Sequence, residues 1–180
     1  MKFRIIACLI VLSAGVIQAQ EIKWMTMNEA LKAQKKHPKK IFMDAYTTWC
    51  GPCKLLDRNT FANKDVVEYV NKHYYPVKFN AEGEGTINYK DMTFTNPNYD
   101  ASRTGRNGTH QFASAMRISG YPTIVFFAED GDLIAPIVGY RTPEQLEIFL
   151  KMFAKDDHKK LTSQSAFSDY RENFVGEFKN

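Results

Sequence analysis

Two cysteines separated by two residues form the most reactive pattern in the chain. Cys50 and Cys53 enclose Gly51-Pro52 and follow an apolar run, residues 41–46, whose composition indicates a buried strand. Cys50 is therefore expected where a strand ends and a helix begins. Unpaired N–H groups and the positive end of the helix dipole favour a thiolate at that place, and thiolates attack disulfides. Cys50 is the candidate nucleophile.

The second cysteine is the candidate resolving thiol. Cys53 follows Cys50 by one helical turn, which is close enough for an intramolecular disulfide, and Pro52 suits a first-turn position because no N–H bond is lost there. A structural disulfide and half of a metal site are the alternatives. A metal site would need further ligands, and the third cysteine, Cys8, lies in the N-terminal segment. The pattern favours redox chemistry without a metal or a cofactor.

Two acidic residues flank the cysteine pair. Asp44 interrupts the apolar run six residues before Cys50. A charged carboxylate is costly in a buried strand, so its pKa is predicted to rise, which makes Asp44 the candidate acid/base for Cys53. Asp57 lies seven residues after Cys50 and four after Cys53, on the same helix face as both sulfurs. It could carry a proton there, and a solvated surface aspartate is the alternative.

The stretch from Trp49 to Lys54 resembles the active site of thioredoxin. The resemblance covers roughly residues 22–153 and is broken by one insertion. It implies a thioredoxin fold, with a central mixed β-sheet flanked by helices, and it places Trp49, Gly51, Pro52 and Lys54 around the reactive pair. Four further features resemble the family in chain order: Asp44 as a buried acid, Lys78 in the next strand, Gly120-Tyr121-Pro122-Thr123 as the cis-proline loop, and Val138-Gly139-Tyr140 as the last strand.

Within the family, Thr60-Phe61, Asp65-Val66 and Gly139-Tyr140 are similar to an exported subset. This subset includes the C-terminal domain of the thiol:disulfide interchange protein, in which a glutamate stands where this chain has Asp57. The resemblance implies a protein-disulfide oxidoreductase with a Cys50–Cys53 disulfide. It also implies that the bond between Tyr121 and Pro122 is cis and presents a backbone edge to the substrate.

The implied partners are disulfide-containing exported proteins and a membrane electron donor that restores the reduced pair. The direction of electron transfer is less determined, because disulfide oxidases and isomerases carry the same kind of pair. The Gly51-Pro52 dipeptide resembles thioredoxin and favours a reductant. A thioredoxin-fold binding module, in which the thiols are incidental, is the alternative of a different class.

The flanking sequence predicts an α/β architecture. The strand–helix–strand order from residue 41 to residue 80 implies two parallel strands joined by a right-handed crossover. Asp130-Gly131 predicts a tight turn that makes strands 124–127 and 133–138 antiparallel, and Pro136 places the second of them at the sheet edge. Three residues are predicted to cap the starts of helices: Thr26, Asn63 and Thr142.

The N-terminal segment, residues 1–19, has the three zones of a secretory signal peptide. A short basic start precedes an apolar run that is too short to span a membrane, and the segment ends in small and polar residues. We expect cleavage after Ala19 and an exported, periplasmic type of location. A lipid anchor at Cys8 is the disfavoured alternative, because the apolar segment before it is too short.

Two further segments lie outside the thioredoxin-like pattern, whose domain is predicted to span residues 20–155. Residues 81–108 form an insertion rich in turn residues, with no regular structure predicted, that could reach the rim of Cys50 and select substrates. Residues 156–180 form an extension. Aromatic residues recur there every three or four positions and predict an amphipathic helix from Ser165 onward, packed on its own domain or on a partner.

The charge of the chain argues against nucleic-acid binding. The sequence has 24 Lys and Arg against 20 Asp and Glu, for a formal charge of +4, which is too weak and dispersed for a nucleic-acid footprint. A hydrophobic content of 44% supports a packed core. His110 is expected to be an exposed residue at a helix end, because one histidine makes no metal site.

Overall fold

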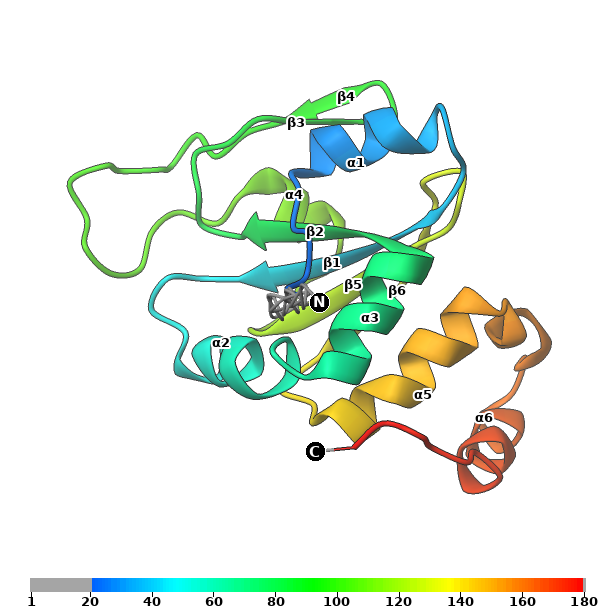
Figure 1. The fold of residues 1–180 in the computed structure, drawn as a ribbon. Helices are drawn as coiled ribbons and strands as arrows, with labels where there is room; N and C mark the ends of the chain where they lie inside the picture. Colours follow the sequence, from blue (N-terminus) through cyan, green and yellow to red (C-terminus); the bar gives the residue numbers. More distant parts are fainter. Residues whose placement is uncertain (1–20, 180) are drawn as a thin grey trace, which may run out of the picture.

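The computed structural model describes residues 21–179, and a four-stranded mixed sheet forms its centre (Figure 1). The strand order is β2-β1-β5-β6, with β1 at Lys40–Tyr46, β2 at Tyr74–Asn80, β5 at Thr123–Phe127 and β6 at Leu133–Val138. Strands β1 and β2 run parallel, whereas β5 is antiparallel to both β1 and β6. The predicted parallel pair, the antiparallel hairpin and the edge position of Pro136 are confirmed.

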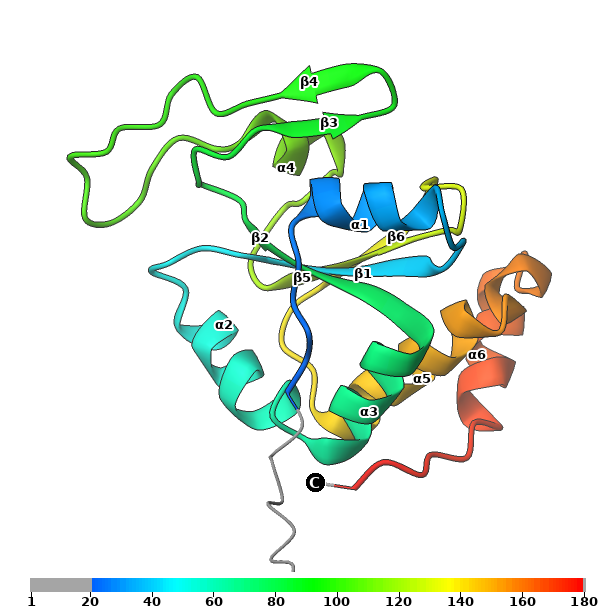
Figure 2. The same cartoon turned by 45° about the horizontal axis from the view of Figure 1, so that its top comes forward.

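Helices cover both faces of this sheet (Figures 1 and 2). One face carries α1 (Met27–Gln34), α4 (Gln111–Ala115) and a hairpin of β3 (Ile87–Tyr89) and β4 (Met92–Phe94). The other face carries α2 (Gly51–Leu55), a π-helical turn (Leu56–Thr60), α3 (Lys64–His73) and α5 (Pro143–Ala154). A 3-10 turn (Asp157–Lys160) and α6 (Gln164–Glu172) follow α5. This is the thioredoxin fold.

The pleat of β1 divides the core between the two faces. Ile41 and Met43 belong to the cluster beneath α1 and α4, whereas Phe42 belongs to the cluster beneath α3 and α5. Because side chains alternate along a strand, Asp44 lies on the same face as Phe42. The parallel register pairs Asp44 with Lys78 of β2. Pleat and register together therefore bring the acid and the lysine side by side.

The predicted helix starts are confirmed at all three capping residues. Thr26 and Thr142 each form a reciprocal capping box, in which a side chain three residues later accepts a hydrogen bond from the N–H of the cap. The Asn63 side chain accepts hydrogen bonds from the first N–H groups of α3. The turn between β5 and β6 contains Gly131 with φ of 83°, a left-handed conformation that glycine adopts without steric cost.

The insertion contains a β-hairpin, whereas the sequence predicted no regular structure for residues 81–108. Ile87 and Tyr89 of β3 point inward and are 7% and 6% exposed, so this strand closes the α1 side of the core. Lys90 and Asp91 form the turn with φ of 49° and 61°. Hairpin turns with two positive φ values usually carry Asn-Gly or Asp-Gly, and this pair lacks that signature. The hairpin was missed for this reason.

His110 is buried rather than exposed, with 1% of its surface accessible. Its Nδ1 accepts a hydrogen bond from the N–H of Phe112 at 3.0 Å and so caps α4. Its Nε2 lies 2.6 Å from the carbonyl oxygen of Gly85, and its ring packs edge-on against Phe79. The expectation of an exposed histidine was wrong because the insertion folds back over it.

The C-terminal extension packs on its own domain. Phe167, Tyr170 and Phe178 contact the core cluster beneath α3 and α5, so of the two alternatives the extension takes packing on its own domain. The helix is shorter than predicted: α6 ends at Glu172, so Phe174 and Phe178 lie beyond it. The predicted signal segment lies outside the described residues. None of the helices from residue 21 to 179 has the length and apolar composition needed to span a bilayer.

Candidate functional site

The cysteine pair lies where the central strand β1 leads into α2, as the sequence predicted. Cys50 is the N-cap of α2, and its Sγ accepts a hydrogen bond from the N–H of Cys53 at 3.1 Å. Pro52 occupies the first turn, and the two cysteines are joined by a disulfide. When the disulfide is reduced, this N–H donor and the helix start favour the thiolate of Cys50 over its thiol.

Both sulfurs are nearly covered. Cys50 and Cys53 are each 2% exposed, whereas Gly51 and Pro52 between them are exposed and Trp49 beside them is 36% exposed. Lys54, the next residue of the predicted surround, is also exposed. The exposed surface next to Cys50 in the chain therefore consists of the Trp49 side chain and the Gly51-Pro52 turn.

A single lysine joins the two acidic residues predicted for the site. Lys78 Nζ lies 2.8 Å from Oδ2 of Asp44 and also forms an ion pair with Asp57. Asp44 comes from β1, Lys78 from β2 and Asp57 from the turn after α2, so three elements meet at this point. The side chain of Asp44 is 1% exposed and that of Asp57 is 45% exposed. The trio thus connects a buried carboxylate to solvent.

Burial dominates the acidity of Asp44. It raises the pKa of this carboxyl from the usual 3.8 to about 6, although the positive charge of Lys78 acts in the opposite direction. The second carboxylate oxygen, Oδ1, has no hydrogen-bond partner among the described residues. Burial also disfavours the charge of Lys78, but the two carboxylates outweigh it and raise the pKa of Lys78. Asp44 is therefore suited to exchanging a proton near neutral pH.

Aromatic rings that the sequence did not single out surround Lys78. Its Nζ lies 5.0 Å from the ring centroids of Trp24 and Tyr46 and 5.3 Å from that of Phe61. Ring faces attract a cation and also exclude water from it. These rings strengthen the pairing of Lys78 with Asp44. Tyr46 shares the alternation of Asp44 along β1, which is the one sequence signal that pointed to its place.

The predicted cis-proline loop lies beside the cysteine pair. The Tyr121–Pro122 bond is cis, and Thr123 pairs with Ala45 of β1, shortly before the cysteines. The rings of Tyr121 and Trp49 meet edge to face at 6.2 Å. Among the described residues, neither the N–H nor the C=O of Tyr121 makes a hydrogen bond. A free backbone edge therefore lies next to the disulfide.

The insertion also reaches the site. Glu82 accepts a hydrogen bond from Nε1 of Trp49 at 2.8 Å and another from the N–H of Asn107 at 2.8 Å. The guanidinium carbon of Arg106 lies 4.3 Å from the centre of the Trp49 ring. The expectation that residues 81–108 approach the rim of Cys50 agrees with these contacts. Glu82 and Arg106 themselves carried no sequence signal, because no local pattern links them to Trp49.

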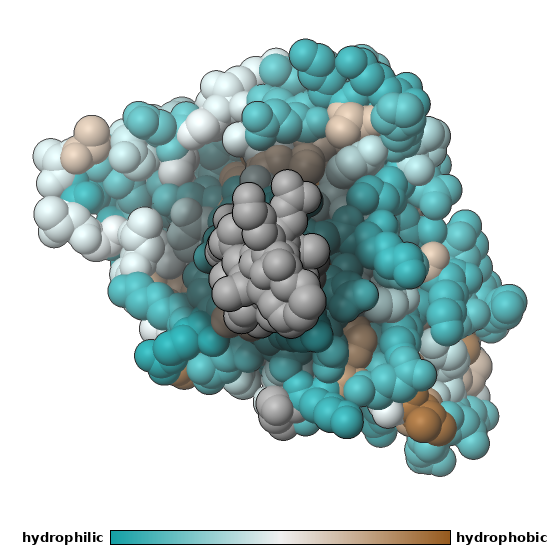
Figure 3. All heavy atoms as spheres, in the orientation of Figure 1, coloured by the Kyte–Doolittle hydropathy of each residue, from teal (hydrophilic) through white to brown (hydrophobic). Residues whose placement is uncertain are grey.

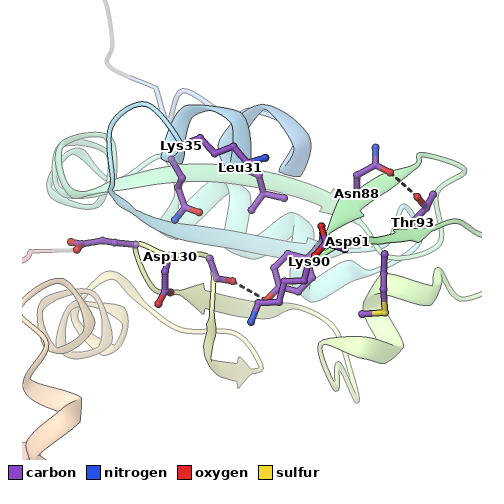
Figure 4. A pocket seen from close by; sticks show the side chains of 12 residues that line it. Leu31, Lys35, Asn88, Lys90, Asp91, Thr93 and Asp130 are labelled. Atoms are coloured by element: carbon purple, nitrogen blue, oxygen red, sulfur yellow. Dashed lines mark hydrogen bonds between the residues drawn. The ribbon is translucent and has the colours of Figure 1, made fainter.

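A cavity of about 690 Å³ lies away from the cysteines, between α1, the β3–β4 hairpin and the β5–β6 turn (Figure 4). Leu31, Lys35, Lys90 and Asp130 are among the residues that line it. Lys90, in the hairpin turn, also forms an ion pair with Asp132. The cavity is at the end of the sheet where β1 begins, whereas the cysteines follow the end of β1. It therefore takes no part in the chemistry of the sulfurs. No cluster of three or more metal-binding side chains occurs within residues 21–179.

Comparison with known proteins gives one consistent family. Residues 27–154 match the model of a family described as thioredoxin-like domain. The chain is 25% identical over 130 residues to the thiol:disulfide interchange protein DsbD of Pectobacterium atrosepticum, which covers 71% of this chain and 18% of DsbD. It is 26% identical over 113 residues to the thioredoxin of Mycoplasmoides gallisepticum, covering 63% of this chain and 83% of that protein.

Solved structures agree on the fold. A thioredoxin-fold protein from Helicobacter pylori superposes with a TM-score of 0.57, covering 75% of this chain and 81% of that one. The two sequences are 13% identical, so this similarity supports the fold alone.

Proposed function

The chain belongs to the thioredoxin-like family of thiol–disulfide oxidoreductases, and we propose that it reduces the disulfides of exported proteins. The observation that carries the proposal is the Cys50–Cys53 disulfide at a helix start beside the Tyr121–Pro122 loop. Export rests on the signal-like pattern of residues 1–19. In an oxidising compartment a reductant needs an electron supply, so a membrane electron donor is the proposed partner that restores the dithiol.

The reaction proceeds in two exchanges. The Cys50 thiolate attacks one sulfur of the substrate disulfide, which forms a mixed disulfide and releases the other substrate sulfur as a thiolate. The Cys53 thiolate then attacks the sulfur of Cys50. This step forms the Cys50–Cys53 disulfide and releases the second substrate thiol. Two electrons pass from the cysteine pair to the substrate, and the two substrate thiolates take up protons.

Asp44 supplies the proton transfer in the second exchange. Cys53 is buried, and its helix α2 leads into the turn at Leu56, which packs with Phe42 on the face of β1 that carries Asp44. Cys53 therefore loses its proton to a protein group and not to bulk water. Asp44 accepts this proton, because its raised pKa lies near the pH at which a thiol must be deprotonated. Lys78 and Asp57 connect Asp44 to solvent, to which the proton is returned.

The substrate lies along the cis-proline loop. The unpaired N–H and C=O of Tyr121 suit pairing with an extended substrate segment, as in recognition by strand addition. Pro122 offers no N–H, and its carbonyl oxygen already accepts a hydrogen bond from Gly139 at 2.8 Å. Pairing at Tyr121 would hold the substrate disulfide over Cys50.

Replacement of Cys53 by alanine tests this function. The Cys53→Ala variant is expected to accumulate mixed disulfides with a model substrate such as insulin, because the resolving thiol is absent. The Cys50→Ala variant is the matched control and should trap none. An absence of trapped product with Cys53→Ala would favour a binding module. A glutathione titration tests the direction, since a midpoint above about −150 mV would place the protein with oxidants.

A further inference from the structure

Arg106 is an exposed arginine that lies over the tryptophan beside the reactive cysteines. It belongs to the loop between β4 and α4, which projects beyond the sheet on the same side as the connection from β1 to α2 (Figures 1 and 2). Its guanidinium lies over the Trp49 ring at 4.3 Å. Among residues 21–179 it forms no ion pair, whereas Arg103 of the same loop pairs with Asp100. Its N–H donors are therefore available to a ligand.

Hydrogen bonds fix the base of this loop in place. The Asn96 amide donates to the carbonyl oxygens of Gly83 and Gly108, and Glu82 ties Trp49 to the N–H of Asn107. A Cβ on Gly108 would lie 2.5 Å from the carbonyl oxygen of Asn98, so the two segments approach as closely as glycine allows. These hydrogen bonds and the close backbone approach hold Arg106 beside Trp49. Figure 3 shows the loop projecting with mostly hydrophilic and neutral residues on the face in view.

Position and charge together indicate what Arg106 contacts. Trp49 belongs to the exposed surface next to Cys50, so substrate residues that cross this surface near the disulfide pass the guanidinium. The carboxylate of Glu82 is nearby, but it is 9% exposed and already accepts two hydrogen bonds. The exposed residues that flank Trp49 and Cys50 at this rim, Arg106 and Lys54, are cationic, and the partly exposed carboxylate of Asp57 is already paired with Lys78. A guanidinium binds a carboxylate with two parallel hydrogen bonds, which an ammonium group cannot do.

We propose that Arg106 is a specificity residue that binds an aspartate or glutamate close to the disulfide of the substrate. This inference rests on the proposed reductase function and adds a substrate class to it: proteins whose cystines are flanked by acidic residues. The insertion would then supply a positively charged binding residue beside the sulfurs, and the ring of Trp49 would position the guanidinium of that residue.

Two disulfide peptides test the proposal. They are identical except next to the cystine, where one carries aspartates and the other lysines. Reduction by the full-length dithiol protein would be followed under single-turnover conditions at low salt. The acidic peptide is expected to react roughly three- to tenfold faster, in line with a partly solvated ion pair. Arg106→Glu should invert this preference, and Arg106→Gln should abolish it. Salt at 0.5 M should reduce it, because the charges are screened.

Two further variants separate recognition from a structural effect. Arg106→Lys keeps the charge and should retain a weaker preference, whereas loss of support for Trp49 alone would change both rates equally. Arg103→Ala, on the same loop, should leave the ratio unchanged. A ratio that is unaltered in Arg106→Glu, or that changes equally in Arg103→Ala, would contradict the proposal. A protein that reduces neither peptide would overturn the reductase function itself.

Discussion

Lys78 illustrates how one residue links a buried carboxylate to solvent. Its cation lies between Asp44 and Asp57 and within a set of aromatic rings, so it can keep its charge although it is largely buried. Burial nevertheless raises the pKa of Asp44 to about 6. A raised pKa means that the folded protein holds this proton more tightly than the unfolded chain does. The contribution of Asp44 to stability is therefore complete below pH 3.8 and is lost as the pH rises through 6.

Asp44→Asn should raise the stability of the protein at pH 8 and slow its reduction of the substrate disulfide. At pH 8 the free energy of unfolding is expected to rise by about 3 kcal/mol, because the two-unit pKa shift costs about 1.36 kcal/mol per unit. Near pH 3.5 the change should vanish, since Asp44 is then neutral in both states. Urea unfolding at the two pH values measures this difference. The second exchange, in which Cys53 releases the substrate from the mixed disulfide with Cys50, should also slow at pH 8. Single-turnover reduction of a substrate measures this rate.

Asp57→Asn is the matched control for that experiment. Its side chain is 45% exposed, so its ion pair with Lys78 is screened by water and should change stability by less than about 1 kcal/mol. Equal stability of the wild type and Asp44→Asn at pH 8 would refute the assignment of Asp44 as a destabilising buried acid.

At the scale of elements, a buried carboxylate of helix α5, that of Glu147, binds the C-terminal segment of the chain. Glu147 is 0% exposed and accepts hydrogen bonds from the N–H groups of Glu177, at 2.8 Å, and Phe178, at 3.0 Å. It also pairs with Lys151 at 2.7 Å. The segment after α6 continues to α3, where Asn63 and Asp65 bond the backbone of Lys179. Two helices thus hold an extended segment without a strand or a helix of its own.

Glu147→Gln should release this segment. The amide keeps one acceptor but loses the charge that strengthens the two N–H bonds, so we expect a loss of about 1–3 kcal/mol in the free energy of unfolding. Hydrogen exchange at the amides of Glu177 and Phe178 should accelerate at the same time. Glu172→Gln, on the exposed surface of α6, is the control and should change neither quantity. Unchanged protection of both amides in Glu147→Gln would show that the carboxylate does not anchor the segment.

At the scale of the whole molecule, residues 156–179 of the C-terminal extension cover the domain core and lie apart from the cysteines. Its aromatic residues Phe167, Tyr170 and Phe178 pack on the core beneath α5, and Asp156 pairs with Lys40 at the start of β1. The cysteine pair instead lies beyond the other end of β1. Changes in the extension are therefore expected to alter the stability of the protein without altering disulfide reduction by the cysteine pair.

A truncation after Lys155 should keep disulfide reduction and lose stability. Three half-buried aromatic residues at roughly 1 kcal/mol each predict a loss of about 3 kcal/mol, measured by urea unfolding. The effect of Glu147→Gln should shrink in the truncated chain, because the residues that it bonds are absent and the two changes are not additive. Loss of reduction in a folded truncated protein would instead place the extension in the functional site.

Local patterns were sufficient to predict the strands of the central sheet, the capped helix starts and the reactive pair. The capping residues, the Asp130-Gly131 turn and the Cys50–Cys53 spacing depend on neighbours within a few residues, where steric and hydrogen-bonding preferences act directly. The raised pKa of Asp44 was also predictable, because an acid within an apolar strand is buried wherever that strand lies in the sheet.

Tertiary structure alone decided which distant residues complete the site. The contacts of Glu82 and Arg106 with Trp49, the rings around Lys78 and the burial of His110 join segments far apart in the chain, and no periodicity records such contacts. The β3–β4 hairpin is stabilised by burial of Ile87 and Tyr89 against α1 and α4 and has no turn signature of its own. Packing overrode local propensity there, so the path of the insertion to the cysteines emerged only from the folded chain.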